Sequence, residues 1–126
     1  MEKTRRNIKR NVLTPQEEEL MRYVWIGKRG YIRDFREMYA APLPPYTSVA
    51  TIMKKLEAKG YVNAKRCGNT YEYTPLIEQE AHKKASMSAM VSHYFQNSYK
   101  EMVTFFAKEE KLSEEDLKEI IKLIKK

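Results

Sequence analysis

The first stretch of the chain with a periodic apolar pattern predicts a helix between Thr14 and Gly27. Thr14 can cap this helix, Pro15 suits its first position, and Glu17 can complete a capping box. The apolar side chains that follow recur at the spacing of one helix face: Leu20, Met21, Val24 and Trp25. The segment is therefore expected to be a helix with one buried face.

Two further helices are expected after a short link. The second spans about 33–40. The proline-rich segment 42–45 predicts a turn, because each proline removes a backbone donor and restrains the residue before it. The third helix is expected to open at Tyr46 or Thr47 and to end at Gly60, since glycine is typical of a left-handed C-terminal cap.

Aromatic and β-branched residues are frequent in segments 61–66 and 70–73, which flank the glycine-containing turn 67–69. This arrangement predicts an antiparallel hairpin, and Pro75 closes it. Three helices followed by a hairpin within about 75 residues is the element order of a winged helix-turn-helix.

From Ile77 onward the apolar pattern is helical throughout. Ser98 with Glu101 and Ser113 with Asp116 mark the starts of two helices. Two apolar stripes lie at helical spacing: Met87, Met90, Val91 and Tyr94 in the first, and Leu117, Ile120, Ile121 and Ile124 in the last. A short tail cannot bury both stripes against itself, so we expect them to form a dimer interface.

The fold class expected from these elements is mainly α with a small β-hairpin. It is a winged helix-turn-helix followed by a C-terminal helical dimerisation region. The expected divisions are a basic arm at 1–12, the winged helix at 13–75 and the dimerisation region at 76–126. A length of 126 residues with 42% hydrophobic content suits one small domain with an oligomerisation appendage.

The net charge of +7 is confined to one part of the chain. Residues 1–75 hold fifteen Lys and Arg against eight Asp and Glu, whereas residues 76–126 hold nine of each. Charge that serves only solubility would be spread more evenly along the chain. A basic surplus in one domain is typical of a protein that binds a polyanion, above all nucleic acid.

The predicted third helix has an inward and an outward face. Val49, Ile52, Met53 and Leu56 recur at helical spacing and are expected to pack inward. The candidate DNA-binding residues of the outward face and its flanks are small, hydroxylated or basic: Tyr46, Thr47, Ser48, Ala50, Thr51, Lys54 and Lys55. Such side chains can meet base edges and phosphates in a major groove. An ordinary solvated face usually carries Glu as well as Lys.

The predicted hairpin adds Lys65, Arg66 and Asn69 near its tip, where basic side chains can reach phosphates or the minor groove. Its tyrosines could stack on the bases of a single strand: Tyr61, Tyr71 and Tyr73. We expect them instead to anchor the hairpin to the helices, because a two-stranded ribbon is marginal without a packed face.

Four segments, 13–25, 46–56, 59–62 and 71–75, resemble the penicillinase repressor family (BlaI/MecI/CopY). The resemblance extends from about Leu13 to the end of the chain. It implies a homodimer that binds a dyad operator in double-stranded DNA and represses antibiotic-resistance genes. It also implies that repression ends when a membrane sensor-transducer with a zinc-protease domain detects a β-lactam and triggers cleavage of the repressor.

The tail segment 103–110 is similar to the family's cleavage region, in which the bond lies between Asn and Phe. Here Phe105 stands in place of that Asn, and Phe106 follows it. The copper-responsive branch of the family carries paired Cys-x-Cys motifs in its tail, and this tail has no cysteine. The chain is therefore expected to lie closer to the BlaI/MecI branch.

Catalysis, cofactors and metals are not expected. Cys67 is the single cysteine, which excludes an internal disulfide and a multi-cysteine metal site. The sequence shows no glycine-rich phosphate loop, nucleophile elbow or His/carboxylate cluster, and His82 and His93 are interpreted as surface or interface residues. With no apolar run of membrane-spanning length and no secretory signal, we expect a cytoplasmic protein that does not insert into membranes.

Two other functions are compatible with a winged helix. One is a module for protein–protein assembly, against which the basic arm, the basic hairpin tip and the acid-poor third helix argue. The other is a ligand-sensing regulator with a small-molecule pocket, for which the tail is short.

Overall fold

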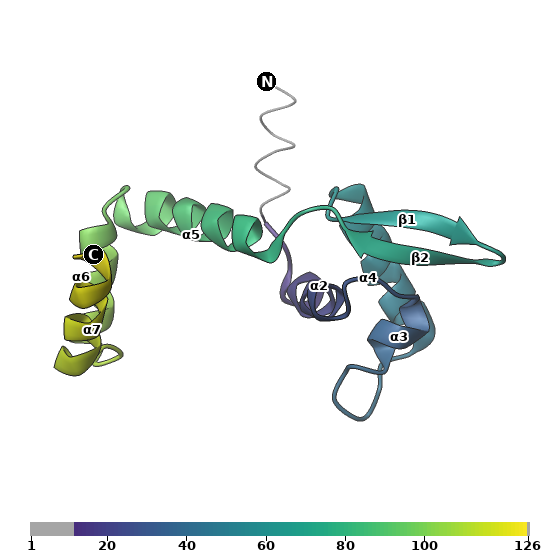
Figure 1. Ribbon diagram of the computed structural model, residues 1–126, viewed down its shortest axis with the longest axis horizontal. Coiled ribbons are helices and arrows are strands. Elements are labelled where there is room, and N and C mark those ends of the chain that lie inside the picture. Colours follow the sequence, from purple (N-terminus) through teal and green to yellow (C-terminus); the bar gives the residue numbers. More distant parts are fainter. Residues whose placement is uncertain (1–11, 126) are drawn as a thin grey trace, which may run out of the picture. The chain divides into compact units, whose positions relative to one another are not determined.

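The computed structural model describes residues 12–125, so residues 1–11 of the expected basic arm lie outside the described part. Six helices and two strands follow in order (Figure 1): α2 Pro15–Gly27, α3 Ile32–Arg36, α4 Tyr46–Ala58, β1 Val62–Cys67, β2 Thr70–Pro75, α5 Gln79–Phe95, α6 Tyr99–Lys108 and α7 Glu114–Ile124. The predicted fold class is confirmed: the protein is mainly helical, with one antiparallel hairpin and C-terminal helices after a winged helix.

Helix α2 begins with the predicted capping box. The backbone N–H of Glu17 donates to the Thr14 hydroxyl at 3.2 Å, and the Thr14 N–H donates to the Glu17 carboxylate at 2.9 Å. Pro15 occupies the first turn, where its missing N–H costs nothing. The same carboxylate lies 2.6 Å from the ammonium group of Lys59, just after α4, so this cap also connects α2 to the end of α4.

The core of the winged helix lies between α2, α3 and α4 and is closed by the hairpin. Its side chains are buried: Leu20, Met21, Val24, Ile32, Phe35, Val49, Met53, Leu56, Tyr61, Val62 and Tyr73. Burial of one such side chain contributes about 1.5–3 kcal/mol. The inward face predicted for α4 is confirmed, and Ile52 packs at the edge of the same cluster.

Helix α3 is shorter than the expected 33–40, because it ends at Arg36. The chain continues in tighter turns, in which the Tyr39 N–H donates to the Arg36 carbonyl at 3.2 Å. The Arg36 guanidinium donates to the Pro44 carbonyl at 2.6 Å and holds the following loop close to α3. Prolines in that loop cannot supply the donors that a longer helix needs.

The hairpin pairs β1 with β2 in one register, from Val62 opposite Pro75 to Cys67 opposite Thr70. The turn therefore has two residues, not the three expected over 67–69, because Cys67 still pairs with its partner strand. Gly68 in this turn has a φ of +65°, which glycine adopts without steric cost. A bridge between Gly30 and Tyr73 joins the hairpin to the start of α3.

The chain divides between Ser86 and Met87 into two compact units. The sequence pattern changes earlier, near residue 75, but the first turns of α5 belong with the winged helix. In the second unit, Ser98 caps α6 through the Glu101 N–H and Ser113 forms a capping box with Asp116, as predicted. Neither α6 nor α7 has a buried residue.

Candidate nucleic-acid interface

The outward face of α4 is open to solvent. Of the seven predicted contact residues of this helix, Tyr46, Thr47, Ser48, Thr51, Lys54 and Lys55 are exposed and Ala50 is half-buried. The buried residues Val49, Met53 and Leu56 hold the opposite face against α2 and α3. The helix therefore presents its hydroxyl and ammonium groups from a rigid support.

The N-terminal end of α4 is electrostatically suited to an anion. Its N-cap residue Pro45 offers no side-chain acceptor, and its first turn carries no acidic residue. By contrast, α2 and α7 both carry acidic side chains in their first turns. Since the N-terminus of a helix has a partial positive charge and free N–H groups, this end of α4 can receive a phosphate.

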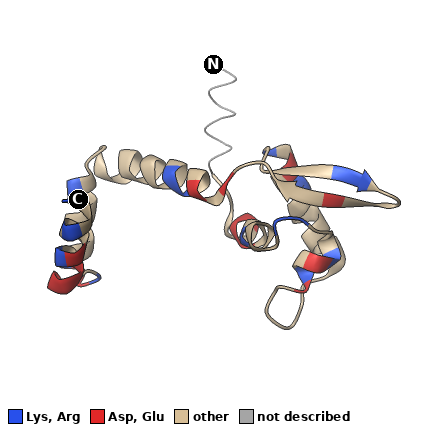
Figure 2. Ribbon diagram, in the orientation of Figure 1, with Lys and Arg blue, Asp and Glu red and all other residues tan. Residues whose placement is uncertain are grey.

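The hairpin places its basic residues on both of its faces. Lys65 stands opposite Glu72 and Arg66 stands opposite Tyr71, and successive residues of a strand point to opposite sides. Figure 2 shows this basic segment of β1 in blue, beside the acidic residue of β2 in red. Both basic side chains and Asn69 are exposed, while the Arg66 Nε donates back to the Gly68 carbonyl at 3.2 Å.

A groove of about 380 Å³ lies beside the start of α4 and is lined by Tyr31, Arg33, Tyr46 and Thr70. The sequence interpretation included Tyr46 but missed the other three, because they come from the start of α3 and from β2. Arg33 lies 5.8 Å from the Tyr31 ring, an arrangement that leaves a guanidinium at the edge of the groove. The density of basic residues between 28 and 36 was the available signal.

The tyrosines of the hairpin mostly serve packing. Tyr61 and Tyr73 are buried, so they cannot stack on the bases of a single strand, and only Tyr71 of the three is exposed. Burial raises the pKa of Tyr73, with smaller contributions from Glu57 and neighbouring tyrosines. A hydrogen bond with Cys67 raises the pKa of the phenol of Tyr31, which lines the groove.

The residues expected at a dimer interface lie in α5 and α7. Met87, Tyr94, Ile120, Ile121 and Ile124 are exposed, while Met90 and Leu117 are half-buried. Val91 differs because it is 1% exposed and is already covered by its own chain. The three exposed isoleucines of the α7 stripe are available to a second chain.

The candidate cleavage residues lie in the last turn of α6. Phe105 is 49% exposed and Phe106 is half-buried. Their carbonyls accept hydrogen bonds from beyond the helix, Phe105 from the Glu109 N–H at 3.1 Å and Phe106 from the Lys111 N–H at 2.9 Å. A bond so near a helix end can become extended when only a few hydrogen bonds open.

The interpretation of His82 as a surface or interface residue is wrong, because the side chain is 6% exposed and is buried within its own unit. Its Nδ1 lies 2.9 Å from the Tyr61 hydroxyl, and its Nε2 lies 3.1 Å from the Glu18 carboxylate. The chain thus contains a His/carboxylate pair that the sequence did not reveal. Its geometry is that of a carboxylate–imidazole–hydroxyl triad, but the Tyr61 side chain is 0% exposed, which keeps a substrate away from the hydroxyl.

No helix among residues 12–125 is both long enough and apolar enough to cross a membrane. Three helices followed by a hairpin, with no acidic residue in the first turn of the third helix, form a winged helix-turn-helix domain, a fold typical of transcription regulators.

The profile of the penicillinase repressor family matches residues 13–126, and the chain belongs to this family. It is a transcriptional repressor. The chain is also similar to the methicillin resistance regulatory protein MecI of Mammaliicoccus sciuri, Staphylococcus aureus and Staphylococcus epidermidis. Each is 21% identical over 116 residues, which cover 90% of this chain and 94% of the relative.

Proposed function

We propose that this repressor acts as a homodimer on a dyad operator in double-stranded DNA, with one α4 helix in the major groove of each half-site. The observation that carries the proposal is the exposed face of α4, on which hydroxyl groups and lysines occur together, with Ala50 at the flank. The first turn of this helix carries no acidic residue. The groove beside Tyr46 and the basic hairpin extend this surface toward the flanking phosphates.

The regulated genes are proposed to be those of β-lactam resistance or a related stress response. The support is the family of the chain together with the methicillin resistance regulatory function in the names of its relatives. Dimerisation is proposed through the exposed apolar residues of α5 and α7, because an uncovered stripe of this kind is costly in water unless a second chain buries it.

Repression is proposed to end by cleavage near Phe105 and Phe106, triggered by a membrane sensor-transducer metalloprotease. The position of this pair in the last turn of α6 supports the proposal. A protease needs an extended substrate, and the end of a helix becomes extended when only a few hydrogen bonds open. Cleavage there would remove α7 and its apolar stripe. Each winged helix would then bind its half-site alone. It would lose the increase in DNA affinity that comes from two linked half-site contacts.

The DNA-binding proposal is tested with three variants of α4 and the hairpin, measured against DNA selected by the wild-type protein from a random pool. Thr51→Ala should relax base preference at one position, a loss of about 1–3 kcal/mol of discrimination. Lys54→Ala and Arg66→Ala should weaken binding to all DNA sequences by the same factor. Each should also reduce the slope of the logarithm of affinity against the logarithm of salt concentration by about one unit.

Lys84→Ala is the matched control, because Lys84 is an exposed lysine of α5 outside this surface. It should leave both the sequence preference and the salt slope unchanged. Equal losses of specificity from the threonine and lysine variants would contradict the proposed division of roles. A wild-type protein whose DNA affinity does not fall with salt would contradict DNA binding itself.

Direct effector binding is a second candidate for how repression ends. A cavity of about 370 Å³ lies between α2 and α4 and includes Gln16, Glu19, Tyr39, Ser48 and Ile52 in its lining. Because Ser48 also belongs to the proposed DNA-contacting surface, a molecule bound there could alter that surface. Persistence of the intact chain during full induction would favour this account.

A further inference from the structure

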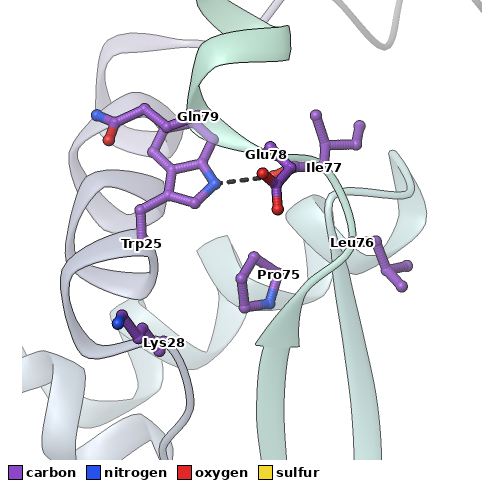
Figure 3. A pocket seen from close by; sticks show the side chains of 7 residues that line it. All are labelled: Trp25, Lys28, Pro75, Leu76, Ile77, Glu78 and Gln79. Atoms are coloured by element: carbon purple, nitrogen blue, oxygen red, sulfur yellow. Dashed lines mark hydrogen bonds between the residues drawn. The ribbon is translucent and has the colours of Figure 1, made fainter.

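The link between the hairpin and α5 is held by a specific contact. The indole Nε1 of Trp25, in α2, donates to the carbonyl of Ile77 at 2.8 Å. Figure 3 shows this hydrogen bond beside a cavity of about 320 Å³, whose lining includes Lys28, Pro75 and Leu76. The Leu76 N–H also donates to the Tyr61 carbonyl at 2.8 Å, and Ile77 packs against the core. The link is therefore held to α2 and to Tyr61 before α5 begins.

The next fastening point is His82, in the first turns of α5. Its Nε2–H donates to the Glu18 carboxylate at 3.1 Å, since a carboxylate can only accept, and its Nδ1 lies within hydrogen-bond distance of the Tyr61 hydroxyl, at 2.9 Å. The imidazole also lies against two rings, with centroid distances of 5.5 Å to Trp25 and 5.3 Å to Tyr61. One side chain of α5 thus contacts α2 and the segment that joins α4 to β1.

These contacts lie within the first compact unit, which ends at Ser86. One turn beyond His82, the Ser86 hydroxyl lies 3.4 Å from Nε2. Helix α5 continues without a break to Phe95. Because a helix without a proline or bulge resists bending, contacts that hold the first turns of α5 also restrain the turns that follow in the same helix.

We propose that His82 is a positioning residue for operator recognition: by fastening the first turns of α5 to α2 and Tyr61, it sets the half-site spacing that the dimer accepts. The inference rests on the proposed dimer on a dyad operator. A dimer discriminates between half-site spacings only if each DNA-reading helix is held rigidly to its own dimerisation helices. A loosely joined pair would tolerate several spacings and would lose part of the gain from linked binding.

The test uses full-length His82→Phe, which keeps an aromatic ring against Trp25 and loses the hydrogen bonds to Glu18 and Tyr61. The probes are DNA duplexes that carry either one half-site selected by the wild-type protein or two half-sites at spacings changed by single base pairs. Wild type should prefer its best spacing over one shifted by two base pairs by about tenfold or more. In the variant this preference should fall to about threefold or less, with half-site affinity within about twofold of wild type.

Lys84→Ala is the control, because Lys84 is an exposed residue on the same helix outside the proposed dimer interface. It should keep the wild-type spacing preference. Trp25→Phe removes the bond to Ile77 while keeping a ring, and it should broaden the spacing preference in the same way if His82→Phe does not fold.

Three results would overturn the inference. An unchanged spacing preference in both folded variants shows that these contacts do not position the half-sites. A parallel loss of half-site affinity shows that His82 serves only the fold of the winged helix. If wild type itself binds DNA with no spacing preference, the dyad operator of the proposed function fails together with the inference.

Discussion

Glu17 is a buried carboxylate that depends on one lysine. Burial alone would raise its pKa, but the hydrogen bond from Lys59, the Thr14 backbone bond and the Lys59 charge outweigh burial and lower it below 4.5. The Lys59 Nζ also donates to the Val12 carbonyl at 3.0 Å. This pair joins the start of α2 to the end of α4, so its loss would loosen two sides of the core.

Lys59→Met should reduce the free energy of unfolding at pH 7 by about 3 kcal/mol, because it leaves Glu17 buried without its counter-charge. Since the folded pKa of Glu17 is depressed, the stabilisation is present above pH 4.5 and is lost as pH falls through the folded pKa. The difference between variant and wild type should therefore shrink below pH 4.5. Urea unfolding at several pH values measures this.

Lys118→Met is the control for this prediction. It removes a solvent-exposed pair, in which the Lys118 ammonium lies 3.8 Å from the Glu114 carboxylate, and should leave stability unchanged. A stability gap between Lys59→Met and wild type that is constant from pH 7 to pH 3 would show that the loss comes from packing of the lysine stem and not from its charge.

Tyr39 presents the opposite case, a buried polar group without a partner. Its hydroxyl makes no hydrogen bond among the described residues, and burial, with Glu19 and Tyr23 nearby, raises its pKa to about 12. Tyr39→Phe should leave the free energy of unfolding unchanged or raise it by about 1 kcal/mol, because it removes an unsatisfied hydroxyl.

Tyr23→Phe is the matched control and should lower the free energy of unfolding by about 1 kcal/mol, since the Tyr23 hydroxyl donates to Glu19 at 2.9 Å. Thermal unfolding of the two variants compares them, and a larger loss from Tyr39→Phe would reverse the argument.

At the scale of elements, α7 is stable at its start and uncovered along one side. The Ser113–Asp116 capping box and three acidic residues in the first turn favour this helix. Its apolar side chains have no partner within their own unit that buries them, and Ile124 is 76% exposed. We expect a second chain to bury the exposed apolar side chains of this helix.

Ile121→Asp should convert the proposed dimer into monomers, because a carboxylate would then be buried in the proposed apolar interface. The dimer dissociation constant should rise by about a hundredfold or more. Sedimentation velocity over a range of protein concentrations measures the change. Lys122→Asp introduces the same group on the polar side of α7 and should remain dimeric, so dissociation of both variants would mean that the helix itself had been disrupted.

At the scale of the whole molecule, the proposed repression cycle depends on keeping α7 attached to the winged helix. A cut near Phe105 and Phe106 separates them in the sequence, and affinity for a dyad operator should fall by about 10²–10⁴-fold as linked binding is lost. Mass spectrometry of the repressor from induced cells should detect a fragment that ends between Val103 and Lys108. Intact chain in cells whose regulated genes are fully expressed would refute cleavage and favour the effector cavity between α2 and α4.

The order of elements and their caps could be predicted from the sequence because those signals are local. Thr14 and Glu17 are three residues apart, as are Ser113 and Asp116, and each pair specifies a helix start through its own backbone. The apolar spacing of α4 likewise determined which face packs inward. The exposure of the candidate contact residues on that helix followed from the same spacing, because the opposite side of a packed helix meets solvent.

Only the tertiary structure decided the features that join distant residues. His82 and Glu18 are 64 positions apart in the sequence. No local pattern indicates that a histidine on a polar helix will be buried between Glu18 and Tyr61. The groove beside Tyr46 likewise combines α3, α4 and β2. The bond from Arg36 to Pro44, which holds the loop after the early end of α3, also joins residues eight positions apart. Helical periodicity and capping act within about four residues, whereas these contacts exist only after the chain has packed.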